Sequence, residues 1–232
     1  MIFLELFSAL SVPSEISVDE FVRDAAEEII RKYEKAMISK TVADEFSFAS
    51  EADRSEIAAI AVQSASADSG EILASVHYNR RRALIEEALK DYFAENDLLN
   101  LDGFIKFRLG DYKEELRRIC FSAADEFAAK REYDEFLDML RFFVSVQSPR
   151  EELVHVVKKG SELRILSKRK KDITELYAAE FAQSGEELTD EDIALSALIA
   201  IAPGTVIIHG ERGSNPLFDT IEAIFDEVKY RR

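Results

Sequence analysis

The spacing of the apolar residues changes once along this chain, and the change limits what the chain can fold into. Up to Pro149, apolar residues recur at every third or fourth position, which is the period of an α-helix with one buried face. Beyond Pro149, β-branched residues follow one another in short runs that glycine or proline bounds, a pattern typical of strands. We therefore predict an α+β protein that is predominantly helical and carries a small C-terminal β-sheet.

The helical part divides into four expected helices. The first three cover about residues 18–39, 57–65 and 78–96. The fourth, over residues 111–144, would be about 50 Å long at 1.5 Å per residue, and the sequence admits a break in it near residues 130–132. Pro149 follows it and excludes any continuation.

The fourth helix carries a stripe of large apolar side chains. Phe127, Phe136, Leu140 and Phe143 lie on this stripe, so we expect their burial to dominate the free energy of folding. The 16 phenylalanines and the absence of tryptophan favour a packed core over an aromatic cage for a ligand. Cys120, the single cysteine, falls on the same stripe and is expected to be a small core residue.

The part after Pro149 alternates strands and helices. We expect a hairpin from residues 153–157 and 163–166, a strand over 205–209, and helices over 173–181, 193–201 and 217–225. Because residues 1–76 contain few large apolar side chains, we divide the chain into a helical N-terminal region, 1–76, and an α+β domain, 77–232. Residues 1–12 are apolar, but no basic residue precedes the apolar stretch, so they lack the charged start of a secretory signal. We expect them to form a buried strand or short helix instead.

Composition and charge exclude several classes of protein. A net charge of −16, more than half of it within residues 1–76, repels the backbone of a nucleic acid. A single cysteine cannot form an intramolecular disulfide or a Cys-x-x-Cys zinc site. No apolar run approaches the roughly 18 residues that a membrane-spanning helix needs. We therefore expect a cytoplasmic protein without a membrane span, a metal or a cofactor.

Two of the three histidines, His155 and His209, fall on expected strands and could face each other across the sheet. With an acidic side chain they would form a metal site or an acid–base pair. No His-x-x-x-His or His-Glu-x-x-His spacing supports a metal, so a structural role is favoured.

The loop from Gly210 to Gly213, between a strand and a helix, could present N–H groups to an anion. It lacks the lysine of a phosphate loop, and Glu211 would repel a phosphate, so a simple turn is favoured there.

Two basic clusters stand out in this acidic sequence. They are Arg80, Arg81 and Arg82, and the run from Lys168 to Lys171. The arginines lie near a helix start, where the helix dipole disfavours cations, so we expect them to have partners such as Glu86, Glu87 or an acidic group of a neighbouring element. Neither cluster has the stacking aromatics of a nucleic-acid interface, so nucleic acid is not favoured as a partner.

Arg108 follows the pair Asp102-Gly103, which we expect to form a tight turn. In that turn Phe104 and Phe107 would face the core and Arg108 would face outward. A guanidinium of this kind could clamp an acidic partner or bridge two helices internally, and internal bridging is favoured.

Several segments over roughly residues 77–226 are specific in combination, although none is specific alone. They are residues 79–85, 95–97, 101–109, 132–136, 140–144, 154–156, 196–203 and 207–209. With these segments the chain resembles the YtxC-like family of sporulation proteins from endospore-forming bacteria. The resemblance implies a cytosolic protein linked to sporulation, and it brings no activity and no catalytic residue.

Three hypotheses on function follow. The first is a non-enzymatic protein-interaction or regulatory factor that acts during sporulation on an unknown protein partner, with an apolar patch beside Arg80, Arg81 and Arg82 as its mark. The alternative is a small-ligand binder or an enzyme that uses His155, His209 and the loop from Gly210 to Gly213, which requires these groups to meet in one cavity. The third is nucleic-acid binding through the two basic clusters, which would depend steeply on salt.

Overall fold

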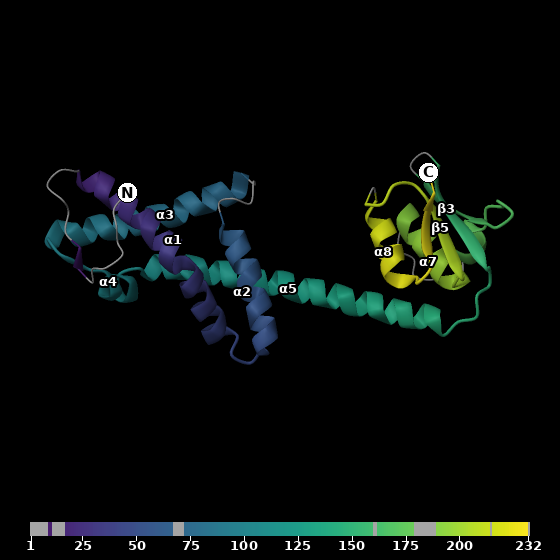
Figure 1. Cartoon of the computed structure of the whole chain (residues 1–232), viewed down its shortest axis with the longest axis horizontal. Helices are drawn as coiled ribbons and strands as arrows, with labels where there is room; N and C mark the ends of the chain where they lie inside the picture. Colours follow the sequence, from purple (N-terminus) through teal and green to yellow (C-terminus); the bar gives the residue numbers. More distant parts are fainter. Residues whose placement is uncertain are drawn as a thin grey trace. The chain divides into compact units, whose positions relative to one another are not determined.

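The computed structural model of the chain (Figure 1) describes residues 9–10, 17–66, 72–159, 162–178, 189–213 and 215–231. The chain clusters into two compact units, residues 1–130 and residues 131–232. Each unit has a hydrophobic core of its own. The division that we expected at residue 76 does not coincide with the boundary of these units, because the first two helices share a core with the helices after them.

Unit 1, as we call residues 1–130, is built from helices and one short pair of strands. Its elements are β1 (Ala9–Leu10), α1 (Val18–Glu45), α2 (Glu51–Ala65), α3 (Ile72–Glu95), β2 (Leu99–Asn100), α4 (Leu101–Phe107) and the first part of α5 (Gly110–Ser145). β1 and β2 pair antiparallel. Of the expected segment 1–12, only β1 lies within the described residues.

The helices of unit 1 begin where short polar side chains can cap them. Ser17 accepts a hydrogen bond from the Glu20 N–H at the start of α1, and Ser50 accepts one from the Asp53 N–H at the start of α2. The first helix is longer than the pattern predicted, because its buried stripe continues to Val42.

The segment around Asp102 and Gly103 differs from our expectation. It forms helix α4 and not a tight turn, because the Asn100 side chain accepts a hydrogen bond from the Gly103 N–H and caps a helix there. Phe104 is buried as expected. Phe107, which we expected to face the core, is 74% exposed at the last position of α4.

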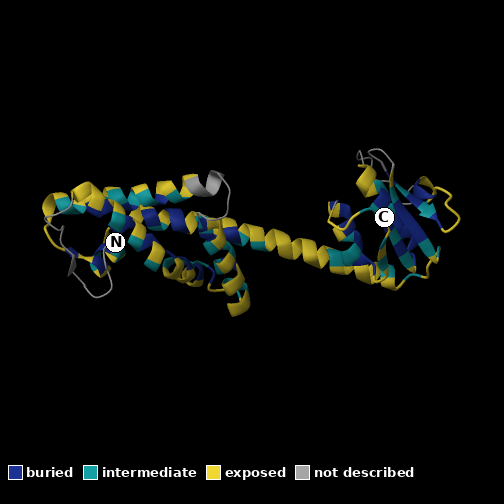
Figure 2. Ribbon diagram, turned by 45° about the horizontal axis from the view of Figure 1, so that its top comes forward, coloured by how far each residue is buried: buried dark blue, intermediate teal, exposed yellow. Residues whose placement is uncertain are grey.

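Helix α5 corrects two further expectations. It is continuous from Gly110 to Ser145, and it contains no break at residues 130–132, a stretch without glycine or proline. Phe127 packs on the core of unit 1 and Leu140 on the core of residues 131–232. Phe136 and Phe143, which we expected to be buried with them, are exposed. Most of the middle of α5 is exposed (Figure 2). Cys120 is fully buried, as predicted.

Unit 2, as we call residues 131–232, contains the rest of α5 and a four-stranded sheet. Its other elements are β3 (Leu153–Lys159), β4 (Glu162–Ser167), α6 (Thr174–Ala178), α7 (Asp190–Ile201), β5 (Thr205–His209), α8 (Pro216–Ile224) and β6 (Val228–Arg231). The strand order is β4-β3-β5-β6, with β3, β5 and β6 parallel and β4 antiparallel to β3. The predicted α+β class with a small C-terminal sheet is therefore confirmed.

Helices α7 and α8 cover one face of this sheet. The covered face contributes Val156, Val206 and Ile208 to the same buried cluster as Leu198 of α7 and Ile221 of α8. The opposite face, which we call the open face, carries side chains that are mostly half-buried. Within the described ranges, no helix combines the length and the apolar character needed to cross a bilayer.

Candidate functional site

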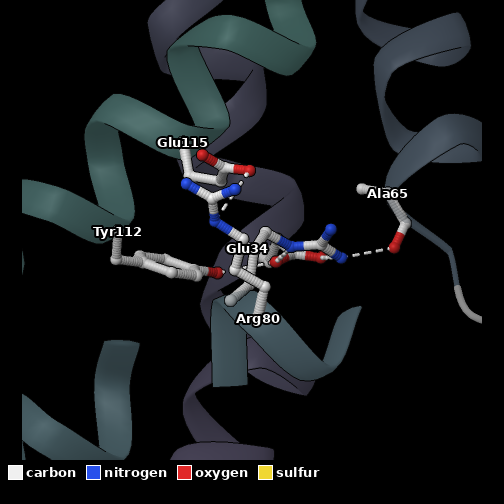
Figure 3. A network of polar contacts seen from close by, with 6 residues as sticks. Glu34, Ala65, Arg80, Tyr112 and Glu115 are labelled. Atoms are coloured by element: carbon white, nitrogen blue, oxygen red, sulfur yellow. Dashed lines mark hydrogen bonds and ion pairs between the residues drawn. The ribbon is translucent and has the colours of Figure 1, made fainter. Parts of the chain in front are cut away.

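The arginine cluster of α3 consists of the buried Arg81, the half-buried Arg82 and the exposed Arg80. The Arg81 side chain is completely enclosed, and its Nε and Nη2 donate to the two carboxylate oxygens of Glu34 on α1, at 2.9 and 3.3 Å. Nη2 also donates to the Ala65 carbonyl at the end of α2. From α5, the Tyr112 hydroxyl donates to Glu34 Oε2 at 2.7 Å (Figure 3). Arg81 thus makes an internal bridge among four helices.

Burial explains the electrostatics of this network. Loss of water around the Tyr112 hydroxyl raises the pKa of that group, and the neighbouring Glu34 carboxylate raises it further. The Glu34 carboxylate accepts hydrogen bonds from both Arg81 and Tyr112, so its negative charge is paired with the positive charge of Arg81. Removing either charged partner would therefore leave the other buried without its counter-charge.

The other two arginines lie at the surface. Arg82 contacts Glu86, the partner that the sequence suggested, at 3.2 Å, and Glu27 at 3.1 Å. Arg80 lies 3.7 Å from Glu115 (Figure 3). These contacts occupy the arginines within the chain.

Arg108 follows α4 and lines an open groove of about 540 Å³ in unit 1. The groove also contains the carboxylates of Glu87, Asp91, Glu95 and Asp111. A groove with this excess of negative charge would favour a cationic group.

The two strand histidines lie together on the open face of unit 2. His155 of β3 stands opposite Ile207 of β5, and His209 of β5 stands opposite Val157 of β3, so the two imidazoles are diagonal neighbours. His155 Nδ1 lies 3.0 Å from His209 Nε2, which is a hydrogen bond whose donor depends on the tautomer. The two rings that the sequence placed on strands therefore touch.

Positive charge surrounds this pair. Burial lowers the pKa of both imidazoles, and Lys170 and Arg231 lower it further. His155 is only 5% exposed, while Lys170 and Arg231 are exposed. No carboxylate is among the groups that shift either imidazole. The sequence did not predict positive charge near the histidines, because Arg231 comes close to them only through the pairing of β6 with β5.

The loop from Gly210 to Gly213 lines a different depression, of about 630 Å³, together with Glu222 of α8 and Tyr230 of β6. Arg212 donates to Glu222 at 2.7 Å. Burial raises the pKa of Tyr230 to about 12, and Glu222 contributes to the rise. Gly213 has a φ of 72°, which explains why a glycine is needed in this turn. The histidines do not line this depression.

A second apolar face on α5 is the feature that sequence reasoning missed. Phe136, Met139, Phe142, Phe143 and Val146 are between 46% and 68% exposed. The first four lie on α5 and Val146 directly follows its last residue, and we call these five residues the α5 row. A signal was present, because apolar residues from position 136 to position 146 occupy more of the helix circumference than one buried face requires.

Comparisons with known proteins give one family and one curated relative of interest. The model of the YtxC-like family matches residues 13–228 and so extends the likeness into the first 76 residues, which the segments of the resemblance do not include. The uncharacterized protein YtxC of Bacillus subtilis (strain 168) is 31% identical over 153 residues, which are 64% of this chain and 53% of that protein. The match thus spans about half the length of this relative. No solved structure shows significant similarity to the chain.

Proposed function

Because the chain belongs to the YtxC-like family, we propose that it is a non-enzymatic protein-interaction factor that acts in the cytoplasm during sporulation, and that the α5 row is its contact surface. The cellular setting rests on the resemblance of the sequence to sporulation proteins. The interaction role rests on one observation, the exposure of five large apolar side chains along the C-terminal end of α5 and at the residue after it.

The C-terminal part of α5 has two apolar faces, and only one of them is used within unit 2. At about 100° per residue, Leu137, Leu140 and Val144 fall within about 60° of one another, and these three pack on the unit 2 core. At the same spacing the α5 row covers about 120° of the helix in another direction. Folding of unit 2 therefore does not account for the row.

The composition of the α5 row suits a protein partner. Aromatic and methionine side chains are enriched at the centres of protein interfaces, and four of the five residues are of these types. The chain carries a net charge of −16, so we expect a partner with an apolar groove and a basic rim. The row would bind in the manner of an amphipathic helix laid into such a groove.

The patch that we expected beside Arg80, Arg81 and Arg82 is not the basis of this proposal. Arg81 is enclosed by its own partners, and the α5 row belongs to the other unit. The alternative hypothesis, a small-ligand binder or an enzyme that uses His155, His209 and the loop from Gly210 to Gly213, requires these groups to meet in one cavity. The two imidazoles contact each other, but they do not line the depression that the loop lines.

The test uses partners recovered from lysates of sporulating cells, then purified and recombined with the protein. Phe142→Asp places a charge in the middle of the α5 row at a position that is 68% exposed, so the fold should tolerate it. We expect the dissociation constant to rise at least about 100-fold, or about 2.7 kcal/mol, as for a hot-spot residue.

The matched control is Phe107→Asp in unit 1, which makes the same change at another exposed phenylalanine. We expect it to leave the dissociation constant unchanged. Equal binding by Phe142→Asp and by the unaltered protein would refute the proposal. A dimer of this chain that Phe142→Asp dissociates would also refute it, since the occupant of the row would then be a second copy.

A further inference from the structure

The open face of the unit 2 sheet carries a polar cluster that the α5 row does not explain. We propose that this cluster, formed by His155, His209, Lys170 and Arg231, binds the phosphate group of a ligand. The inference is independent of the α5 proposal, because the row and the cluster share no residue.

The register of the strands brings His155, His209 and Arg231 to the same part of the open face. Across the open face, His155 is level with Leu166 of β4 and Ile207 of β5, and His209 is level with Arg231 of β6. The imidazoles project from the face opposite the one that α7 and α8 cover, since neighbouring residues of a strand point to opposite faces. Neither of these two helices therefore covers the imidazoles, and the half-buried His209 is the more accessible of the pair.

Lys170 belongs to the turn after β4, and its backbone is held in an unusual conformation. Its φ is 64°, in the left-handed region that side chains other than glycine, asparagine and aspartate rarely adopt. The turn is fixed by hydrogen bonds from the Lys170 N–H to the Ser167 carbonyl and from the Lys171 N–H to the Ser167 hydroxyl. Lys170 combines this backbone conformation with an exposed charge that acts on both imidazoles, a combination that suggests a functional position.

The charges of the open face do not balance near the histidines. Arg164 of β4 has carboxylates within 4 Å, at Asp172 and Glu175, and Lys229 of β6 has Glu227. Among the described residues, Lys170 and Arg231 have no ion pair, and these are the two cations that act on both imidazoles. An anion bound there would supply the missing negative charge.

The protonation states of the two imidazoles determine how the pair would respond to an anion. In the neutral pair one imidazole donates to the other, so the two outer ring nitrogens are one donor and one acceptor. A proton added to the pair converts the outer acceptor into a second donor. Lys170 and Arg231 oppose that proton, and an anion favours it. Anion binding should therefore be coupled to proton uptake.

Phosphate fits these groups better than a metal or a carboxylate does. The cationic neighbours repel a metal ion, and no group of three or more metal-ligating side chains occurs in the described part of the chain. A phosphate monoester carries nearly two negative charges and three acceptor oxygens, which match two imidazole donors, an ammonium and a guanidinium. The phosphate could belong to a small ester or to a nucleic-acid chain.

The experiment follows the histidine ring nitrogens by NMR in the full chain. The protein contains only three histidines, and His77, which is exposed on α3, is an internal control. Inorganic phosphate or sulfate is added at constant ionic strength, to an anion concentration of about 10 mM. This concentration is ten times the dissociation constant of about 1 mM that we expect. We expect saturable shifts at His155 and His209 and none at His77.

Variants and pH give the proposal its sharpest tests. The double variant Lys170→Gln/Arg231→Gln should weaken binding at least about tenfold, or about 1.4 kcal/mol. The control Arg212→Gln removes a cation that Glu222 already neutralises, and binding should not change. Sulfate binding should tighten as the pH falls from about 7.5 to about 6, because the charge of sulfate is constant there and only the imidazoles gain protons.

Several results would overturn the inference. These are no shift at about 10 mM anion, equal shifts at all three histidines, equal affinity in the double variant, and a response to Zn²⁺ alone. Displacement of sulfate by adenosine monophosphate, but not by a single-stranded oligonucleotide without terminal phosphates, would identify a small ester as the source. The reverse, with a steep dependence on salt, would identify a nucleic-acid chain. Failure of both ligands to displace sulfate would contradict the proposal.

Discussion

The buried polar side chains of the two units have opposite electrostatic surroundings. In unit 1 the buried Arg81 donates to the Glu34 carboxylate and to the Ala65 carbonyl, and Glu34 also accepts from the Tyr112 hydroxyl, so the charge of Arg81 is paired within the fold. In unit 2 the buried His155 finds a second imidazole and two cations. A polar group whose partners are all internal stabilises a fold, whereas one whose surroundings lack the opposite charge is available to a ligand.

The largest effect that this contrast predicts concerns Arg81. Arg81→Met leaves the Glu34 carboxylate buried beside only the Tyr112 hydroxyl, so unit 1 should lose about 3–5 kcal/mol of its free energy of unfolding. Cys120 reports on unit 1 alone, because it is fully buried there and burial raises the pKa of its thiol to about 11. The measurement is the rate of thiol labelling against urea concentration.

Two companion variants decide whether the loss belongs to the buried pair. Arg80→Met removes an exposed cation 3.7 Å from Glu115 and should cost less than about 1 kcal/mol. Arg81→Met/Glu34→Leu removes both charges and should recover most of the loss. If the double variant is no more stable than Arg81→Met, the description of unit 1 as internally neutralised is wrong.

The two faces of α5 supply the next test, within unit 2. Leu140 packs on the core and is half-buried, so Leu140→Ala should lower the stability of unit 2 by about 1–3 kcal/mol. Phe142→Ala on the α5 row should change it by less than about 0.5 kcal/mol. The ring signals of His155 and His209 follow unit 2 during unfolding in urea. A large loss from Phe142→Ala would show that the row serves folding and not a partner.

A smaller effect is expected from pH. The pKa of each paired imidazole is lower in the fold than the ordinary 6.5, so the unfolded chain binds more protons between the two values. The contribution of the pair to stability is therefore present above pH 6.5 and is lost as the pH falls through the lowered pKa. Asp192 responds only at lower pH, since hydrogen bonds from Thr189 hold the pKa of its carboxyl below the usual 3.8.

The measurement compares urea midpoints of unit 2 between pH about 7 and pH about 5. We expect the midpoint to decline in the unaltered protein and to be nearly flat in His155→Gln/His209→Gln. A midpoint that rises on acidification would mean that the imidazoles gain a partner of opposite charge in the fold, against the contrast between the units.

Local patterns predicted the elements that local interactions determine. Thr189 and Asp192 form the reciprocal cap that begins α7, close to where the sequence placed that helix, and β5 has the predicted bounds. Strand β6 was missed, because Val228 is its one β-branched residue and its pairing with β5 is a tertiary contact.

The site residues show the same limit. The sequence placed His155 and His209 on strands, but the cations around them come from a turn and from β6. Arg80, Arg81 and Arg82 are adjacent in sequence, yet the helix period directs Arg81 to the core and leaves its neighbours at the surface. Which faces of α5 would be covered depended on packing that no single helix specifies.

The smallest predicted effect links stability directly to the proposed site. Lys170→Gly removes a side chain from a residue with a φ of 64°, which relieves about 1–2 kcal/mol of strain, while the flexibility of glycine in the unfolded chain costs about 0.5–1 kcal/mol. Unit 2 should therefore gain about 0.5 kcal/mol. Anion binding should weaken in the same variant, because the ammonium is lost. Lys171→Gly, at a neighbouring position without a positive φ, should bring no gain. If Lys170→Gly improves both stability and anion binding, the charge of Lys170 does not explain why a strained residue is kept at this position. The open face would then have one cation fewer to distinguish it from the paired charges of unit 1.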